Sequence, residues 1–300
     1  MRLHPPPPPP PQTAESNALD SATFDVFRCN QFYFEEEYFL GKDIAYAFAT
    51  PPVIFEQVYT LRSIYDNGEY RIKNIVAKTF NLRSLDEPYC ENMGAFAHIP
   101  NGADTLKNLR EFFIFAMHSW IYHDELITSG IYACAFAVAL GYKEIYIAGI
   151  DLYSANRGYA FNPLQSNLLK IMPNYDPNPK PDFMHFPETD LKALEILAKH
   201  HGARFYSLCP SSPISKHIPL APVRADSSPQ DWEQVKKSKP KDATRDMLIP
   251  SKYAYEKMYY GVSISPLNPL RQNLIYRLVR DILRFPSQTK HYIQAKKRYK

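Results

Sequence analysis

The stretch from Ile127 to Phe161 constrains the fold of this chain more than any other. Thr128 and Ser129 can cap the start of a helix, and the segment IYACAFAVAL that follows them has almost no polar side chain. A helix that is apolar on every face has to be buried inside a protein. Gly141 stands where a left-handed C-cap is expected. The sequence therefore predicts a buried helix that ends at this glycine.

The segment EIYIAGID, residues 144–151, comes directly after that helix and is rich in β-branched and apolar residues. This pattern is typical of a buried strand in a parallel sheet. It ends at Gly149 and Asp151, with Tyr153 and Tyr159 shortly beyond. Ligands of open α/β sheets bind at the carboxyl ends of the strands, so we expect Asp151 in a binding site. The alternative is a plain helix–strand unit in which Asp151 only caps the next turn.

Helix and strand patterns alternate along most of the chain. Strands are predicted over 24–29, 44–49, 74–80 and 203–210, and helices over 53–68, 103–120 and 189–202. This alternation predicts the α/β class with a mainly parallel sheet, in a single domain over 23–265. Residues 152–188 have little regular pattern, and so long a segment in a compact domain is usually a lid or a binding loop.

The two ends of the chain differ from this body. Residues 1–22 include a run of prolines from Pro5 to Pro11, which favours solvated polyproline II and predicts a disordered segment. Residues 266–300 contain NLIYRLVRDILRF, whose apolar residues recur at helical spacing up to Pro286, where we expect the helix to stop. We expect this tail to lie on an anionic membrane surface; the alternative is a helix docked on its own domain.

The charge of the chain is concentrated in that tail. The formal net charge is +4, but residues 271–300 carry nine Lys or Arg against one Asp, so the body is mildly acidic. This pattern argues against a nucleic-acid partner and for a surface-binding tail.

Several classes of protein are disfavoured by what the sequence lacks. Its four cysteines form no CxxC pair, which argues against a zinc site or a disulfide scaffold. We find no apolar run long enough to span a bilayer and no apolar region of a signal peptide. The motifs GxGxxG, GxxxxGK[ST], HExxH and GxSxG are absent, as is an Asp-x-Asp pair that could hold a metal for a sugar diphosphate. We therefore expect no metal and no other cofactor.

His185 is the histidine with the most distinctive context. It lies in the segment DFMHFPETD, within the predicted lid and just before a predicted helix. An imidazole titrates near neutral pH, which suits a general base. The sequence context singles out none of the other eight histidines in this way.

Nine separated segments occur here in the order and spacing of one known family: FDVFRCNQFYFEEEYFLGK, FEQVYTL, ITSGIYACAFAVALGYKEIYIAGIDLY, YAF, NLLKIMPN, TDLKALE, LCP, PLAP and DMLIP. From about Phe24 to its end the chain resembles the bacterial sialyltransferases of the Campylobacter lipooligosaccharide type, glycosyltransferase family 42. The resemblance implies a single Rossmann-like domain, a variant of the GT-A architecture. This domain has a mobile lid and binds CMP-sialic acid. It also implies a homo-oligomer in the bacterial cytoplasm, peripheral on the inner membrane.

The resemblance further implies a reaction and a role for each site residue. Sialic acid passes with inversion, and without a metal, to a terminal galactose or another sialic acid of a lipooligosaccharide. The matching donor-binding positions are Asn30, Gln31, Thr128, Ser129, Gly130, Gly149 and Asp151. Tyr153 and Tyr159 match the two phenols that hydrogen-bond the departing phosphate, and His185 matches the base that deprotonates the acceptor hydroxyl. Two phenols can stabilise a single phosphate where a diphosphate would need Mg²⁺.

The chain departs from the family pattern at three places. Prolines stand where the family has its first strand and a Gly-Asn-Gly-Pro-Ser loop for the donor phosphate, Thr50 where it has Asn, and Leu126 where it has Arg. Proline offers no N–H to a sheet or to a phosphate. Three functions therefore stay open: an active sialyltransferase, a catalytically impaired variant with a binding or assembly role, and a CMP-sialate hydrolase.

Overall fold

The described residues of the computed structural model are 24–50, 53–78, 99–152, 165–173, 185–222, 238–254 and 274–298. Their strands form two sheets, in which every pair is parallel. The first sheet has the order β1-β2-β3 and consists of β1 (Phe27–Cys29), β2 (Asp43–Ala49) and β3 (Arg71–Ala77). The second pairs β4 (Glu144–Ile147) with β5 (Arg204–Ser207). The predicted α/β class with parallel strands is confirmed.

The register of the first sheet brings the carboxyl ends of its strands to one edge. Cys29 lies opposite Phe48, and Ala49 lies opposite Ala77. The Lys78 N–H extends the ladder by donating to the Ala49 carbonyl at 2.8 Å. The residues that follow the three strands, Asn30, Thr50 and Lys78, are therefore neighbours at this edge.

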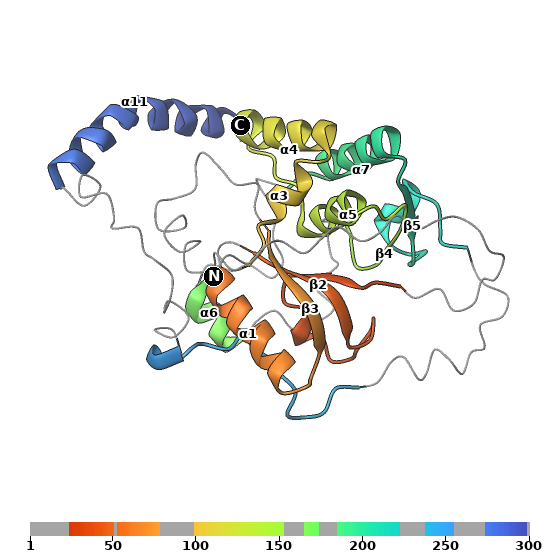
Figure 1. Cartoon of the computed structure of the whole chain (residues 1–300). Coiled ribbons are helices and arrows are strands. Elements are labelled where there is room, and N and C mark those ends of the chain that lie inside the picture. The colour runs from red at the N-terminus through yellow and green to blue at the C-terminus, as the bar shows by residue number, and fades with distance from the viewer. Residues whose placement is uncertain are drawn as a thin grey trace, which may run out of the picture.

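Helices cover both faces of the first sheet (Figure 1). On one face, α1 (Ile54–Asp66) and α6 (Ser166–Ile171) pack in a cluster with Ala47 of β2. On the other, α5 (Ser129–Ala139) packs in a cluster with Phe48. Around α5 lie α3 (Gly102–Leu106), α4 (Arg110–His123) and α7 (Pro187–His201). Two short 3₁₀ turns, η1 (Phe32–Phe34) and η3 (Pro213–Lys216), follow β1 and β5.

The central helix behaves as its sequence predicts. The Thr128 side chain caps α5 by accepting a hydrogen bond from the Ile131 N–H. Every residue from Ile131 to Val138 is buried, so the helix has no face in water. Gly141 has φ +100°, the left-handed conformation that a C-cap requires. The predicted buried helix and its glycine stop are confirmed.

The predicted burial of the following strand is wrong for most of its length. In β4 only Ile147 is buried, while Glu144 is exposed. The physical reason is that β4 has one strand neighbour, β5, within the described part of the chain. Side chains connect β4 and the turn before it to the segment that leads into β1: Phe24 packs edge-on against Tyr146 at 5.5 Å, and the Tyr142 hydroxyl donates to Asp25.

One predicted helix and the predicted lid differ from the structure. The helix expected over 103–120 is divided into α3 and α4, because the chain tightens into i→i+3 turns at Asn108 and Leu109. Helical spacing of apolar residues does not record such a change in axis, which lets α4 pack on α7. Part of the predicted lid is also regular, since α6 lies within 152–188. The lid segments 153–164 and 174–184 lie outside the described residues.

The C-terminal helix continues past the proline that was expected to end it. Helix α11 (Leu274–Arg298) contains Pro286 in its interior. Proline removes one amide donor and crowds the preceding turn, which a helix can accommodate by bending rather than ending. The exposed apolar residues of α11 include Leu274, Ile275, Leu278, Val279, Ile282, Leu283, Phe285 and Ile293. Among the helices described, none is long and apolar enough to cross a membrane. Residues 1–22 lie outside the described residues.

Candidate active site

The first part of the candidate site is the carboxyl edge of the three-stranded sheet. Asn30 directly follows β1 and has φ +58°, which turns the chain away from the sheet into η1. Gln31, the next residue, is buried. Asn is one of the few residues other than glycine that adopt this backbone conformation readily. The left-handed conformation of Asn30 therefore explains why β1 ends at this residue, which is one of the predicted donor contacts.

The second part is the start of α5, where Thr128, Ser129 and Gly130 come together. The first amides of a helix have no acceptor within the helix, so this end is suited to bind an anion. Ser129 Oγ accepts a hydrogen bond from Lys78 Nζ at 2.9 Å, which joins the helix start to the sheet edge. Gly130 is tightly enclosed, because a Cβ there would lie 2.5 Å from Cδ1 of Ile150.

The third part is the start of α7, which is tied to the segment before α5 by three hydrogen bonds. His185 Nδ1 lies 2.8 Å from the Leu126 carbonyl oxygen. Thr189 Oγ1 donates to Glu125 Oε2 at 2.6 Å, and the Thr128 N–H donates to Asp190 Oδ1 at 3.0 Å. His185 is thereby placed beside the predicted nucleotide-binding helix, although the two are far apart in the sequence.

The contact of His185 with Leu126 determines which ring nitrogen can act as a base. A carbonyl oxygen only accepts hydrogen bonds, so Nδ1 carries the proton in this contact. In the neutral ring the lone pair is then on Nε2. An oriented imidazole with its lone pair on the far nitrogen is the arrangement that a general base needs.

The fourth part is the turn after β4. Gly149 has φ +73° and Leu152 has φ +49°, so the chain turns sharply on both sides of Asp151. Asp151 Oδ1 accepts a hydrogen bond from Ser212 Oγ at 3.3 Å. Since Ile150 of this turn packs against Gly130, Asp151 belongs to the same region as the start of α5.

The structure thus places eight of the ten predicted site residues on four neighbouring elements. These are Asn30, Gln31, Thr128, Ser129, Gly130, Gly149, Asp151 and His185. Tyr153 and Tyr159, the predicted phosphate contacts, lie outside the described residues.

Two charged residues of this region were not among the predicted site residues. Burial raises the pKa of the Asp190 carboxyl from 3.8 to about 6, although the Thr128 hydrogen bonds and the charge of Lys78 oppose the shift. Burial lowers the pKa of the Lys78 ammonium from 10.5 to about 8, against the attraction of Cys29 and Asp190. Lys78 lay inside the strand predicted over 74–80, so the available signal was a cation near the carboxyl end of an otherwise apolar strand. Asp190 looked like an ordinary first-turn acid of a helix.

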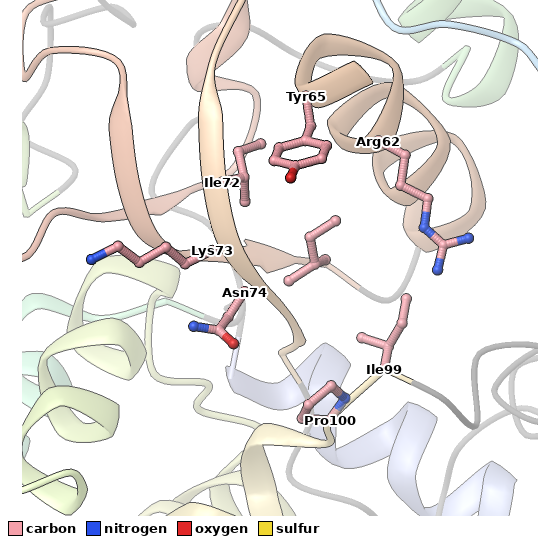
Figure 2. A pocket seen from close by; sticks show the side chains of 8 residues that line it. Arg62, Tyr65, Ile72, Lys73, Asn74, Ile99 and Pro100 are labelled. Carbon is pink, nitrogen blue, oxygen red and sulfur yellow. The ribbon is translucent and has the colours of Figure 1, made fainter. Parts of the chain in front are cut away.

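The described residues offer little else that resembles a site. They contain no group of three or more His, Cys, Asp or Glu side chains that could hold a metal ion. A hollow of about 260 Å³ lies between α1 and β3, lined by Arg62, Tyr65, Ile72, Lys73, Asn74, Ile75, Ile99 and Pro100 (Figure 2). None of the predicted site residues lines it.

Comparison with known proteins identifies the family. The model of the CST-I α-2,3-sialyltransferase family matches residues 17–296. The chain belongs to this family. It is therefore a glycosyltransferase of the sialyltransferase type, in agreement with the resemblance drawn from its segments.

Solved sialyltransferases have the same fold as this family member. The monofunctional α-2,3-sialyltransferase Cst-I from Campylobacter jejuni is 34% identical, with a TM-score of 0.71 over 80% of this chain and 84% of its own. The sialyltransferase CST-II, in complex with a trisaccharide acceptor and CMP, is 40% identical, with a TM-score of 0.67 over 79% of this chain and 90% of its own. An uncharacterized Haemophilus influenzae protein is 34% identical over 77% of this chain and 97% of its own length.

Proposed function

We propose that this family member transfers sialic acid from CMP-sialic acid to a terminal galactose, or to another sialic acid, of a lipooligosaccharide. The transfer inverts the anomeric centre and needs no metal. His185 takes the proton from the acceptor hydroxyl as that oxygen attacks the sialic acid, and CMP leaves from the opposite side. Support for the substrates comes from the related CST-II, whose structure contains CMP and a trisaccharide acceptor.

The observation that carries the proposal is the hydrogen bond between His185 Nδ1 and the Leu126 carbonyl. It orients the ring and leaves the lone pair of the neutral form on Nε2. Leu126 is two residues before Thr128, the cap of α5, so base and nucleotide-binding helix are held by the same short segment. In this proposal the donor residues are Asn30, Gln31, Thr128, Ser129, Gly130, Gly149 and Asp151. Tyr153 and Tyr159 hydrogen-bond the departing phosphate.

The test follows CMP release from CMP-sialic acid, with and without lactose as the galactosyl acceptor. Release that requires lactose is expected for a transferase. Release without an acceptor would indicate a CMP-sialate hydrolase, and no release in either case would indicate a non-catalytic binding or assembly protein.

His185→Ala should lower the transfer rate by about a hundredfold or more, in line with the loss of a general base. His200→Ala is the matched control, because His200 is exposed at the opposite end of α7. Its rate should equal that of the wild type. Transfer by His185→Ala at the wild-type rate would show that the base is another group.

The proposal also includes the membrane surface on which the enzyme works. The exposed apolar residues of α11, together with its basic residues, suit the headgroup region of an anionic membrane. This favours a peripheral location on the cytoplasmic side of the inner membrane, where a glycolipid acceptor is presented. A homo-oligomer is proposed as well, and the exposed Ile114, Ile121 and Tyr122 of α4 are candidates for its interface. Sedimentation of the full-length chain would measure its subunit number.

A further inference from the structure

Lys78 brings a positive charge to the point where the sheet edge meets the start of α5. It directly follows β3, and its ammonium donates to the hydroxyl of Ser129, the first residue of α5, at 2.9 Å. The contact joins two elements that are 51 residues apart in the chain. The parallel register places Lys78 in the same edge as Asn30.

No neighbour among the described residues forms an ion pair with this cation. An ammonium has three donors, and within the described residues the one hydrogen bond recorded for Lys78 Nζ is to Ser129 Oγ. No carboxylate in the same set lies within 4.0 Å of Nζ. Asp190 and Cys29 act on it only through longer-range electrostatics. The ammonium therefore has donors available for an incoming acceptor.

Holding a cation in this place costs free energy. Removal of the ammonium from water lowers the pKa of Lys78 to about 8, so the group is still mostly protonated at neutral pH. Unpaired charges away from water are unfavourable and are concentrated at functional sites, where a ligand supplies the opposite charge. A purely structural lysine would be expected to have a carboxylate partner, as Lys239 has in Glu69 at 3.5 Å.

The groups around Lys78 suit an anion. The first amides of α5, at Ser129 and Gly130, have no acceptor within the helix and lie at the positive end of its dipole. Taken as whole residues, Asn30, Lys78, Ser129 and Gly130 are partly exposed, while the Lys78 ammonium itself is largely withdrawn from water. Behind them, Asp190 is only 1% exposed, and its Oδ2 has no hydrogen-bond partner in the described structure. Asp190 is turned to the Thr128 amide rather than into ion-pair contact with Lys78.

We propose that Lys78, together with Ser129, binds an anionic group of the sugar-nucleotide donor. The assignment rests on the proposed function and adds a cation to the predicted donor residues. CMP-sialic acid carries two such groups, the phosphate and the carboxylate of sialic acid. Both accept charge-assisted hydrogen bonds from an ammonium.

Calorimetric titration of the full chain with cytidine, CMP and CMP-sialic acid tests this role. Lys78→Met should weaken binding of CMP-sialic acid by about 10- to 100-fold, the range for loss of a hydrogen bond to a charged group. Affinity for cytidine, which has no anionic group, should stay the same. An equal loss for CMP would identify the phosphate as the partner of Lys78, and an unchanged affinity for CMP would identify the carboxylate. Lys78→Arg, which keeps the charge, should recover part of the affinity.

Two further variants separate this role from folding and from general charge. Lys78→Gln keeps a hydrogen-bond donor for Ser129 but has no charge, so its affinity for CMP-sialic acid should fall as well. It takes the place of Lys78→Met as the test if Lys78→Met does not fold. Lys73→Met removes an exposed lysine of β3, whose side chain points away from α1 in Figure 2, and this variant should bind all three ligands normally. Thermal unfolding would establish that each variant is folded.

The outcomes distinguish the two proposals. Wild-type affinity for CMP-sialic acid in folded Lys78→Met or Lys78→Gln would overturn the proposed role of Lys78 and would leave the proposed function unaffected. A parallel loss of cytidine affinity would overturn it too, because that result indicates a structural effect. A wild-type chain that binds neither CMP nor CMP-sialic acid would refute the proposed function and this assignment with it.

Discussion

Asp190→Asn should become more stable relative to the wild type as the pH rises from acid to neutral. Asp190 is 1% exposed, and its Oδ1 accepts the Thr128 N–H at 3.0 Å. The amide oxygen of asparagine can accept the same hydrogen bond. What the substitution removes is a carboxylate charge that has almost no contact with water and no ion pair among the described residues.

The magnitude follows from the shift in pKa. Burial is the largest cause that raises the pKa of Asp190 from 3.8 to about 6. One unit corresponds to about 1.4 kcal/mol, so the shift is linked to about 3 kcal/mol of unfolding free energy. Because the folded-state pKa is raised, this contribution is fully present below pH 3.8 and is lost as the pH rises through 6. A loss of this size is large against a typical domain stability of about 5–15 kcal/mol.

Urea unfolding of both chains between about pH 4 and pH 7 would measure the effect. The unfolding free energy of Asp190→Asn minus that of the wild type should rise by about 2–3 kcal/mol across this range. The new amide N–H₂ occupies the place of Oδ2 and lacks an acceptor, which costs about 1–3 kcal/mol at every pH. The test is therefore the change with pH, and not the value at one pH.

Asp104→Asn is the matched control, because the Asp104 side chain is exposed and forms a surface ion pair with Lys107 on the same turn. Its difference from the wild type should stay within about 0.5 kcal/mol across the range. A pH-independent difference for Asp190→Asn as well would refute the reasoning, since it would mean that Asp190 titrates alike in the folded and unfolded chains.

Three further predictions concern the ends of the chain and the mechanism. Deletion of residues 271–300 should move the protein from the membrane to the soluble fraction, because the exposed apolar side chains of α11 are lost; equal partitioning of both chains would contradict this. Addition of a hydrophobic strand and a Gly-Asn-Gly-Pro-Ser loop ahead of Gln12 should tighten CMP-sialic acid binding. Within the described residues β1 and β4 each have one strand neighbour, so each has an edge on which an added strand could pair and carry the phosphate loop. An unchanged Kd would count against this prediction. Transfer should survive EDTA, and loss of activity restored by Mg²⁺ or Mn²⁺ would refute a metal-free mechanism.

The sequence by itself determined those features that depend on residues close together in the chain. Thr128 caps α5, and Gly141 ends the segment in a left-handed conformation. Gly202 ends α7 in the same way, with φ +66°. Capping and left-handed turns are local choices of side chain and backbone, so they can be read without knowing what packs around them.

Burial and partnership across the chain were decided by the tertiary structure alone. An apolar strand pattern is the same whether one or both strand edges are paired, so the sequence could not show that β4 is only partly buried. Nor could it show that the Lys78 ammonium donates to Ser129. It could not show either that Asp190 accepts a hydrogen bond from the N–H of Thr128, which lies 62 residues earlier in the chain. Such contacts depend on which strands are neighbours and on how helices cross them. Spacing along the chain carries no record of that arrangement, and it is the arrangement that gives these two charged residues their shifted pKa values.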